Sequence, residues 1–187
     1  MGSLLSTFST ALEARDPYLR GHSARVTAFA ERLALTLGWP GDRLDVLRLG
    51  GSLHDVGKIA VSVAVLRKRG PLTDEEVEQI RRHPVTGARL VQIFEDFEPA
   101  LPYVLHHHER WDGSGYPHGL RGGEIPLEAR LLGIVDAFDA MTSRRAYRPA
   151  LTIEQALAEL ERCAGSQFDP QLAETFVDGW RRGAIAA

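Results

Sequence analysis

The spacing of apolar residues most strongly constrains what this chain can fold into. Between His22 and Leu37, apolar side chains recur at steps of three and four residues, which places them on one face of a helix. The Gly-Trp-Pro-Gly run at 38–41 then ends that helix in a turn. Similar segments predict helices at about 41–53, 73–83, 85–94, 99–108, 127–141, 153–163 and 169–183. No alternating pattern predicts a strand, so we expect an all-α fold of roughly eight helices.

Polar residues mark the beginnings of several of these helices. Thr73 precedes three acidic residues, the pattern of an N-cap followed by a negatively charged first turn. Thr152 is expected to cap the helix that follows it, and Asp169-Pro170 is expected to start the last helix. Between positions 110 and 126 the helical pattern breaks, because five glycines and two prolines predict one long irregular loop.

Length, charge and cysteine content limit the classes of protein to consider. The 187 residues suit a single domain, 1–187. The net charge of -3 does not favour binding to a nucleic acid polymer. No apolar run approaches the roughly 20 residues of a membrane span, and nothing at the N-terminus resembles a signal peptide, so we expect a cytoplasmic location. The single Cys163 excludes an internal disulfide and a cysteine-based zinc cluster.

The histidines are grouped rather than scattered. His54 stands next to Asp55, positions 106–108 are all histidine, and His118 closely follows Asp112. His54 and Asp55 could converge on one ion near a helix end, and the two oxygens of Asp55 could bridge two ions. The alternative is a capping aspartate beside a partly exposed histidine. The last two histidines of the triplet could also be ligands, whereas the first better fits the polar end of a helix.

Asp136 lies inside a long apolar run. A carboxylate there is expected to be buried, and an unpaired buried charge costs on the order of several kcal/mol, so it needs a hydrogen bond, a counter-charge or a metal. Asp139 could face the same side or be exposed. His22 opens a helix, and His83 precedes a proline that should take its backbone out of the helical region. Each of these two histidines, considered alone, is more often structural.

The combination of ligand types narrows the metal and the chemistry. Imidazole and carboxylate without thiolate suit iron, manganese, zinc or nickel. Two such ions about 3.5–4 Å apart, with a bridging hydroxide, are a common arrangement for hydrolysing a phosphodiester. Lys58, about one turn after His54, could neutralise a phosphate oxygen in the transition state, and an ordinary exposed lysine is the alternative.

Five motifs follow one another in order along the chain. They are D-P-Y-L-R-G-H at 16–22, H-D-V-G-K-I at 54–59, H-P at 83–84, H-H-E-R-W-D-G-S-G-Y-P at 107–117, and I-V-D-A-F-D-A-M-T-S with R-R-A-Y-R at 134–148. Together they resemble the HD-GYP family, a branch of the HD-domain metal-dependent phosphohydrolases that degrades the bacterial second messenger cyclic di-GMP. The resemblance covers about residues 9–165 and implies an HD-domain-type helical bundle with one long Gly/Pro-rich GYP loop.

The resemblance implies a role for each matching position. One metal ion would be held by His22, His54, Asp55 and Asp136. Asp55 would bridge to a second ion held by His83, His107 and His108. Lys58 would contact the scissile phosphate, and with Asp55 it would be catalytic. Substrate would also be bound by Gly115, Tyr116, Arg145 and Arg148. Iron or manganese is the expected metal, and zinc or nickel would also suit.

Two departures from the family pattern refine the expected activity. Some members carry a glutamate four residues before the first histidine, which supports a third ion, and here Tyr18 occupies that position. We therefore expect two ions, an arrangement associated in the family mainly with opening cyclic di-GMP to linear pGpG. The stretch after the second motif, usually similar to Ile-Pro-Asp, reads Val61-Ser62-Val63 and removes no expected ligand.

Other functions and partners stay open at the level of sequence. The chain could hydrolyse another guanine nucleotide, such as pGpG or a mixed cyclic dinucleotide, or it could be a catalytically weak receptor that signals through the GYP loop. The resemblance also implies that this loop can bind a diguanylate cyclase domain. An N-terminal helix carrying Leu4, Leu5 and Phe8 could pair with a second chain to form a homodimer.

Overall fold

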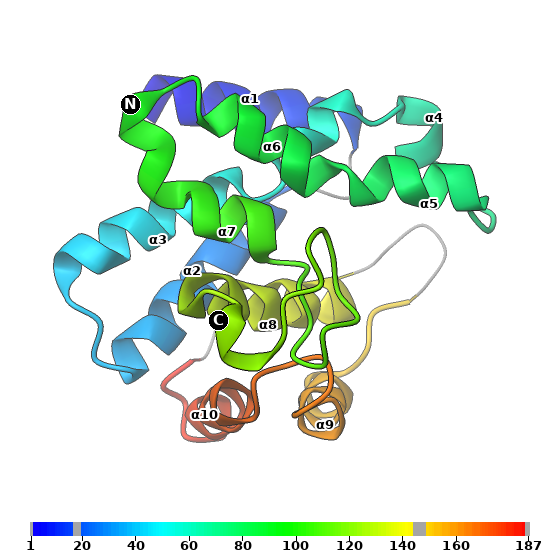
Figure 1. The fold of residues 1–187 in the computed structure, drawn as a ribbon. Helices are drawn as coiled ribbons and strands as arrows, with labels where there is room; N and C mark the ends of the chain where they lie inside the picture. Colours follow the sequence, from blue (N-terminus) through cyan, green and yellow to red (C-terminus); the bar gives the residue numbers. More distant parts are fainter. Residues whose placement is uncertain (1, 17–19, 144–148, 186–187) are drawn as a thin grey trace.

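The computed structural model describes residues 2–16, 20–143 and 149–185, and this part of the chain contains ten α-helices and no strand (Figure 1). The helices are α1 (Gly2–Arg15), α2 (His22–Thr36), α3 (Gly41–Leu53), α4 (Val63–Leu66), α5 (Asp74–Arg81), α6 (His83–Val91), α7 (Leu101–His106), α8 (Leu127–Thr142), α9 (Ile153–Arg162) and α10 (Pro170–Arg181). Three short 3-10 helices are η2 (Val56–Ala60), η3 (Glu95–Ala100) and η4 (Gly122–Glu124). The all-α prediction is confirmed. Helix α1 is the expected N-terminal helix, and the short α4 was not predicted.

Side-chain caps explain where several helices begin. The Thr73 hydroxyl accepts the backbone N–H of Glu76, and the Glu76 carboxylate accepts the backbone N–H of Thr73, which forms a capping box at α5. Thr152 and Gln155 form the same box at α9. The Asp169 carboxylate accepts two N–H groups from the first turn of α10. The three helix starts predicted from these residues are confirmed.

The boundary predicted at His83 is wrong. The sequence suggests that His83 leaves the helical region because a proline follows it, but His83 is the first residue of α6. Pro84 occupies the second position of the helix, where a backbone N–H has no intrahelical partner in any case. Because α5 ends at Arg81, the chain passes almost directly from one helix into the next.

Helix α8 is central to the arrangement. It contacts α2, α7, α9 and α10, and Figure 1 shows α9 and α10 on the side of α8 opposite to α7 and α6. Helix α6 packs on α7 and η2, and α1 packs on η2 and α3. The loop 110–126 runs beside α8 in the same view. The end of α7, the loop and the middle of α8 therefore meet.

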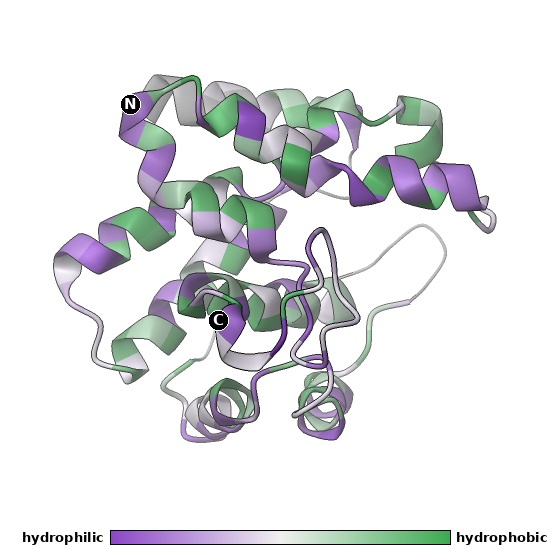
Figure 2. Ribbon diagram, viewed as in Figure 1, coloured by the Kyte–Doolittle hydropathy of each residue, from purple (hydrophilic) through white to green (hydrophobic). Residues whose placement is uncertain are grey.

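Two apolar cores hold most of these helices together. The larger core joins α2, α3, α7, α8, α9 and α10 through buried residues that include Phe29, Leu47, Phe138 and Phe176. The smaller core joins α3, η2, α6, η3 and α7 and includes Val56. Figure 2 shows α8 as mostly hydrophobic and α5 as mostly hydrophilic, which agrees with the central and peripheral positions of the two helices. No helix in the described ranges combines the length and apolar character needed to cross a membrane.

Glycines allow two close contacts that determine where candidate ligands lie. A Cβ atom on Gly57 would lie 1.9 Å from the carbonyl oxygen of His83, so η2 can lie against the start of α6 only without a side chain at this position. A Cβ atom on Gly133 would lie 2.8 Å from the carbonyl oxygen of His107, where α8 passes the end of α7. Both contacts bring a histidine toward the same region of the molecule.

Candidate metal centre

Several helix ends and the middle of α8 converge on one point. The residues at the ends of helices are His22 at the start of α2, His54 and Asp55 directly after α3, His83 at the start of α6, and His107 and His108 directly after α7. Asp136 comes from the middle of α8. The structure thus brings together the seven residues that sequence reasoning singled out as metal ligands.

Asp55 stands between two groups of imidazoles. On one side, Asp55 Oδ1 lies 3.3 Å from His83 Nε2 and 3.9 Å from His107 Nε2. On the other side, Asp55 Oδ2 lies 3.6 Å from His54 Nε2 and 3.8 Å from His22 Nε2. Each carboxylate oxygen faces its own pair of ring nitrogens, which is the arrangement a carboxylate needs to bridge two ions.

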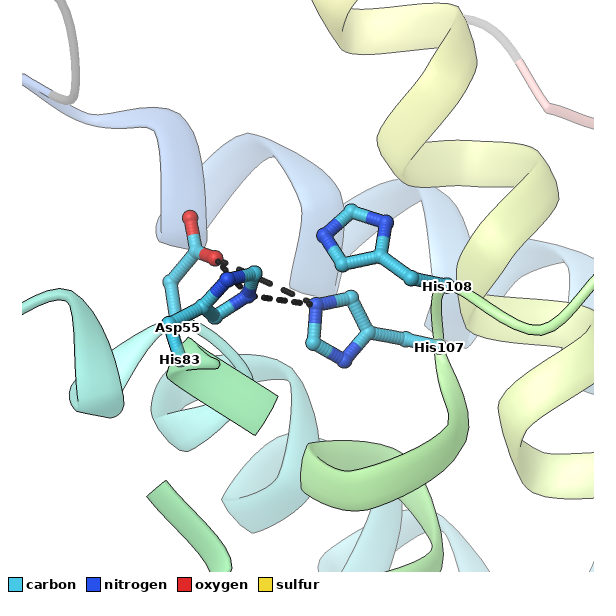
Figure 3. Close-up of side chains that lie close together, drawn as sticks. All are labelled: Asp55, His83, His107 and His108. Atoms are coloured by element: carbon cyan, nitrogen blue, oxygen red, sulfur yellow. Dashed lines mark hydrogen bonds and ion pairs between the residues drawn. The ribbon is translucent and has the colours of Figure 1, made fainter. Parts of the chain in front are cut away.

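His108 completes the first of these groups. Figure 3 shows Asp55, His83, His107 and His108 with their side chains directed toward a common space. Their ligand atoms all lie within 4.8 Å of one another. Three imidazoles and one carboxylate in this space form a ligand set typical of iron, manganese or zinc.

Asp136 belongs to the second group. Its Oδ1 lies 3.2 Å from His22 Nε2 and 4.0 Å from His54 Nε2. Burial raises the pKa of this carboxyl, but the hydrogen bond to His22 and the charges of the surrounding histidines together outweigh burial and hold the pKa well below its usual value. The sequence predicts that Asp136 is buried, and the structure leaves its side chain 17% exposed, so its burial is partial. It keeps this exposure because it borders a cavity.

The outward-facing ring nitrogens determine the tautomers of three histidines. Nδ1 of each ring lies within hydrogen-bond distance of a backbone carbonyl: His54 to Gly51 at 2.8 Å, His83 to Ile80 at 2.7 Å, and His107 to Tyr103 at 2.9 Å. A carbonyl can only accept, so Nδ1 carries the proton and a neutral ring has its lone pair on Nε2. Three lone pairs are therefore directed into the site, as in histidines that bind metals.

Protein atoms do not satisfy these inward-facing groups. His54 Nε2 and Asp55 Oδ1 are buried and have no hydrogen-bond partner. A buried polar group left in this state costs about 1–3 kcal/mol. His83 Nε2 and His107 Nε2 lie 3.3 Å apart, and the tautomers leave no proton to place between them. A cation would bind the unpartnered atoms and would also separate the lone pairs of the two facing ring nitrogens. The residues therefore fit a metal site.

Burial keeps most of these rings neutral. It lowers the pKa of His54, it lowers the pKa of His107 further, and it lowers the pKa of His108 to about 3. These three rings can therefore bind a cation near neutral pH without first losing a proton. Burial would raise the pKa of the Asp55 carboxyl, but the charge of Lys58 together with the neighbouring His54 and His83 outweighs burial and holds this pKa well below its usual value.

Lys58 lies beside the carboxylate that stands between the two groups. Its Nζ is 2.6 Å from Asp55 Oδ2, and its side chain is 19% exposed. The lysine belongs to the short 3-10 helix η2, and Gly57 allows η2 to approach α6. Lys58 is therefore not an ordinary exposed lysine, which was the alternative considered from the sequence.

A hydrogen-bonded pair behind His22 was not predicted from sequence. Asp139 Oδ2 lies 2.7 Å from His22 Nδ1, and Arg25 Nε donates to Asp139 Oδ1 at 2.6 Å. Asp139 is 2% exposed, which settles the choice between a buried and an exposed position. Burial alone would lower the pKa of His22, but hydrogen bonds to Asp136 and Asp139 raise it to about 9. The only sequence signal for this role is the three-residue step from Asp136 to Asp139 along one helix.

The loop 110–126 places an aromatic side chain against the site. The Tyr116 ring stacks on His108, with 4.9 Å between ring centroids and 28° between planes. A Cβ atom on Gly115 would lie 2.3 Å from the backbone nitrogen of Arg110, so this glycine allows the loop to pack on itself. A cavity of about 470 Å³ lies between the loop and α8, and its lining includes His108, Tyr116 and Asp136.

Some predicted residues lie outside the described ranges. They are Tyr18, Arg145 and Arg148. The side chains of Leu4, Leu5 and Phe8 also lie outside the described part, although the backbone of all three belongs to α1. The roles expected for these six residues stay predictions.

The chain is similar to known proteins over most of its length. The family model described as HD domain matches residues 6–172. A cyclic di-GMP phosphodiesterase response regulator from Xanthomonas campestris is 38% identical over 177 residues, which cover 94% of this chain and 47% of that protein. The 3'3'-cGAMP-specific phosphodiesterase 2 from Vibrio cholerae is 35% identical over 179 residues, which cover 95% of this chain and 34% of that protein. The chain therefore spans about a third to a half of the length of these relatives.

Solved structures share the fold. Bd1817, an HDG"Y"P protein from Bdellovibrio bacteriovorus, superposes with a TM-score of 0.69 at 22% identity and covers 86% of this chain and 51% of that chain. A cyclic GMP-AMP specific phosphodiesterase from Vibrio cholerae superposes with a TM-score of 0.72 at 19% identity and covers 97% of this chain and 49% of that chain. At these identities the likeness concerns the arrangement of the helices alone.

Proposed function

The chain belongs to the HD domain family and carries the motifs of its HD-GYP branch, and from this premise we propose that it is a phosphodiesterase that opens cyclic di-GMP, mainly to linear pGpG. The observation that carries the proposal is the position of Asp55 between two groups of imidazoles, with buried ligand atoms that have no protein partner. Relatives named cyclic di-GMP phosphodiesterases, at 35–40% identity, support the choice of substrate. Residues 1–187 would act as one catalytic domain.

Two divalent ions would bind in this site, with iron or manganese expected and zinc or nickel also suited to the ligands. The first ion would be held by His22, His54, Asp55 and Asp136. The second would be held by Asp55, His83, His107 and His108. When bound, the ions would supply Lewis acidity toward a phosphate oxygen and lower the pKa of a water molecule.

The surrounding residues would bind and orient the substrate. Lys58 would place a positive charge beside the scissile phosphate and support the leaving group, and its position 2.6 Å from Asp55 supports this role. Tyr116 and Gly115 would contact the substrate from the loop, and the stacking of Tyr116 on His108 keeps this part of the loop next to the ligands. Arg145 and Arg148 are expected to reach the phosphates or the guanine edges.

A mixed cyclic dinucleotide is the second candidate substrate. Three relatives from Vibrio cholerae, at 32–35% identity, are named 3'3'-cGAMP-specific phosphodiesterases. The chemistry at the phosphate would be the same for both substrates, so only contacts to the second base could distinguish them. A catalytically weak receptor is the third candidate, but no expected ligand is missing from the site.

The decisive experiment compares substrates on one metal-loaded sample. The metal-free protein is reconstituted with Mn²⁺ or Fe²⁺, its metal content is measured, and equal concentrations of cyclic di-GMP, 3'3'-cGAMP and cyclic di-AMP are added. We expect cyclic di-GMP to be consumed fastest, with pGpG as the main product by chromatography. No hydrolysis of any substrate with two ions bound would refute the proposal, and binding without turnover would favour a receptor.

Matched variants test the residues. Asp55→Ala should abolish turnover because it removes the bridging carboxylate, and full turnover by this variant would exclude a binuclear mechanism. Lys58→Met should lower kcat by at least about 100-fold, the cost typical of removing a group that stabilises transition-state charge. Lys68→Met is the control, because Lys68 pairs with Glu76 at the surface and should leave kcat unchanged.

Two protein partners would fit the same chain. The loop 110–126 would offer a surface to a diguanylate cyclase domain, and α1 would pair with α1 of a second copy. Light scattering after size-exclusion chromatography tests the homodimer, and a monomeric mass at micromolar concentration would exclude it in that range. A labelled diguanylate cyclase domain tests the loop, and equal binding by the wild type and by a chain with the loop shortened would exclude it.

A further inference from the structure

A second group of candidate ligands joins the end of α7 to the loop 110–126. His106 is the last residue of α7, Glu109 follows it by three residues, and His118 lies in the loop. One ligand atom from each of the three lies within 4.8 Å of the others. We propose that these three residues form a separate site for a divalent cation of the Zn²⁺ type. No residue is shared between this site and the candidate binuclear centre.

Glu109 supplies a buried negative charge. Its side chain is 0% exposed, and its oxygens accept the backbone N–H groups of His118 at 2.8 Å and of Leu120 at 3.1 Å. No lysine or arginine of the described ranges forms an ion pair with it. Each carboxylate oxygen has two lone pairs, so both backbone hydrogen bonds leave capacity for a cation. A buried carboxylate without a cationic partner is a costly arrangement that a bound ion would relieve.

His106 supplies a nitrogen that no protein atom satisfies. Its Nδ1 is buried, has no hydrogen-bond partner, and lies 3.8 Å from Glu109 Oε1. The sequence predicts His106 at the polar end of a helix, yet its Nδ1 is buried and has no hydrogen-bond partner. A cation bound between this imidazole nitrogen and the buried carboxylate would satisfy both groups.

His118 completes the set from the loop. Its ring centroid lies 5.3 Å from that of His106, with 51° between the ring planes, and its side chain is exposed. The hydrogen bond from its backbone N–H to Glu109 holds the residue beside the other two ligands. Two imidazoles and one carboxylate are a ligand set that zinc accepts, with a fourth position left for water. A cation here would tie the loop to the helix that ends at the candidate binuclear centre.

The test counts metal equivalents in variants that should fold normally. Metal-free protein is titrated with Zn²⁺ under a competing chromophoric chelator, and bound metal is measured by mass spectrometry. His118→Ala removes one ligand from an exposed position, so we expect it to bind one equivalent fewer than the wild type, or to bind that equivalent more than tenfold more weakly. Arg121→Ala is the matched control, because this neighbouring exposed loop residue offers no ligand and should leave the count unchanged.

A second background separates this site from the proposed active site. In the Asp55→Ala background the candidate binuclear centre is damaged, and the difference of one equivalent between chains with and without His118 should persist. Equal metal counts for His118→Ala and the wild type would overturn the proposal, and so would a difference that disappears with Asp55. Failure to hydrolyse cyclic di-GMP would refute the proposed function without affecting this result.

Discussion

At the scale of single residues, a carboxylate outside the ligand set controls His22. Asp139 Oδ2 lies 2.7 Å from His22 Nδ1, and Arg25 binds the same carboxylate. Because Nδ1 is engaged in this way, Nε2 is directed at Asp136 and Asp55. A metal ion that replaced the proton on His22 Nε2 would leave the contact between Nδ1 and Asp139 unchanged. Contacts of this kind, between a ligand and a residue outside the ligand set, commonly affect metal affinity.

Asp139→Asn should therefore weaken metal binding without unfolding the chain. An amide cannot supply the negative charge that supports His22 and Arg25, and loss of an outer contact of this kind typically costs about 10–100-fold in metal affinity. Competition with a chromophoric chelator measures the affinity, and circular dichroism checks the fold. Glu128→Gln is the control, since Glu128 lies on the same helix and pairs with Arg43 at the far end. Equal affinities for the two variants would show that Asp139 does not support the site.

Some residues of the candidate site could be predicted from the sequence and others could not, for a physical reason. Asp136 could be selected because an ionisable side chain is rarely placed in an apolar run without a partner, and His54 and Asp55 could be selected because two potential ligands are adjacent there. Asp139 could not be selected, because its burial depends on Arg25 and His22, which lie more than 100 residues away in the chain. Exposure of Asp136 likewise depends on a cavity that exists only after the helices have packed.

At the scale of elements, the contact between η2 and α6 determines how Asp55 faces His83. A Cβ atom on Gly57 would lie 1.9 Å from the His83 carbonyl oxygen and 2.5 Å from the backbone nitrogen of Gly87. Gly57→Ala should push the two elements apart and lower the free energy of unfolding by about 1–3 kcal/mol, the range for overpacking. Chemical denaturation measures this change. Gly70→Ala is the control, because nothing lies within 4 Å of a Cβ atom at Gly70.

The same experiment has a functional side. If Gly57 positions the ligands, Gly57→Ala should also lose metal under conditions in which it remains folded, while Gly70→Ala should retain metal. Retention of two ions by a folded Gly57→Ala would mean that the contact between η2 and α6 supports the fold but not the site.

The loop offers a second test among the elements. A Cβ atom on Gly115 would meet backbone atoms of Arg110 and Glu109 at 2.3–2.7 Å, so Gly115→Ala should shift the segment that carries Tyr116. We expect kcat/KM for cyclic di-GMP to fall by more than about tenfold, a cost typical of misplacing groups that orient a substrate. Gly123→Ala, with open space around the new methyl group, should leave kcat/KM unchanged. Equal kcat/KM values for the two variants would show that the position of this loop segment does not affect catalysis.

Helix starts could be predicted more reliably than contacts between helices. The caps at Thr73 and Thr152 depend on residues within the next turn, so the local sequence contains the whole interaction. His83 begins α6 because Pro84 falls in the first turn, which tolerates proline, and the sequence alone does not show which residue begins this helix. The close approach at Gly57 also joins segments that are far apart in sequence, and a single sequence carries no local signal for it.

At the scale of the whole molecule, the candidate metal centre lies where two apolar cores meet. His22 and Asp136 come from α2 and α8, which belong to the larger core. Asp55 precedes η2 and His83 begins α6, and both of these elements belong to the smaller core. Shared helices α3 and α7 connect the cores, but the side chains that face each other across the junction are ionisable. Their buried lone pairs weaken the junction until a cation links them.

Removal of metal should therefore lower the thermal stability of the entire chain. A ligand that binds only the folded state at 100 times its Kd adds about 2.7 kcal/mol. For a chain of this size each kcal/mol shifts Tm by about 2–4 °C, so Mn²⁺ should raise Tm by about 5–10 °C over the chelator-treated protein. Differential scanning calorimetry measures the shift. Asp55→Ala should show a much smaller shift, because it removes the carboxylate that faces both groups of histidines and leaves only the proposed site at His106, Glu109 and His118. A shift in this variant equal to that of the wild type would show that the stabilising ion binds elsewhere. Separate unfolding of the two cores in the metal-bound protein, in place of one common transition, would show that the metal does not join them.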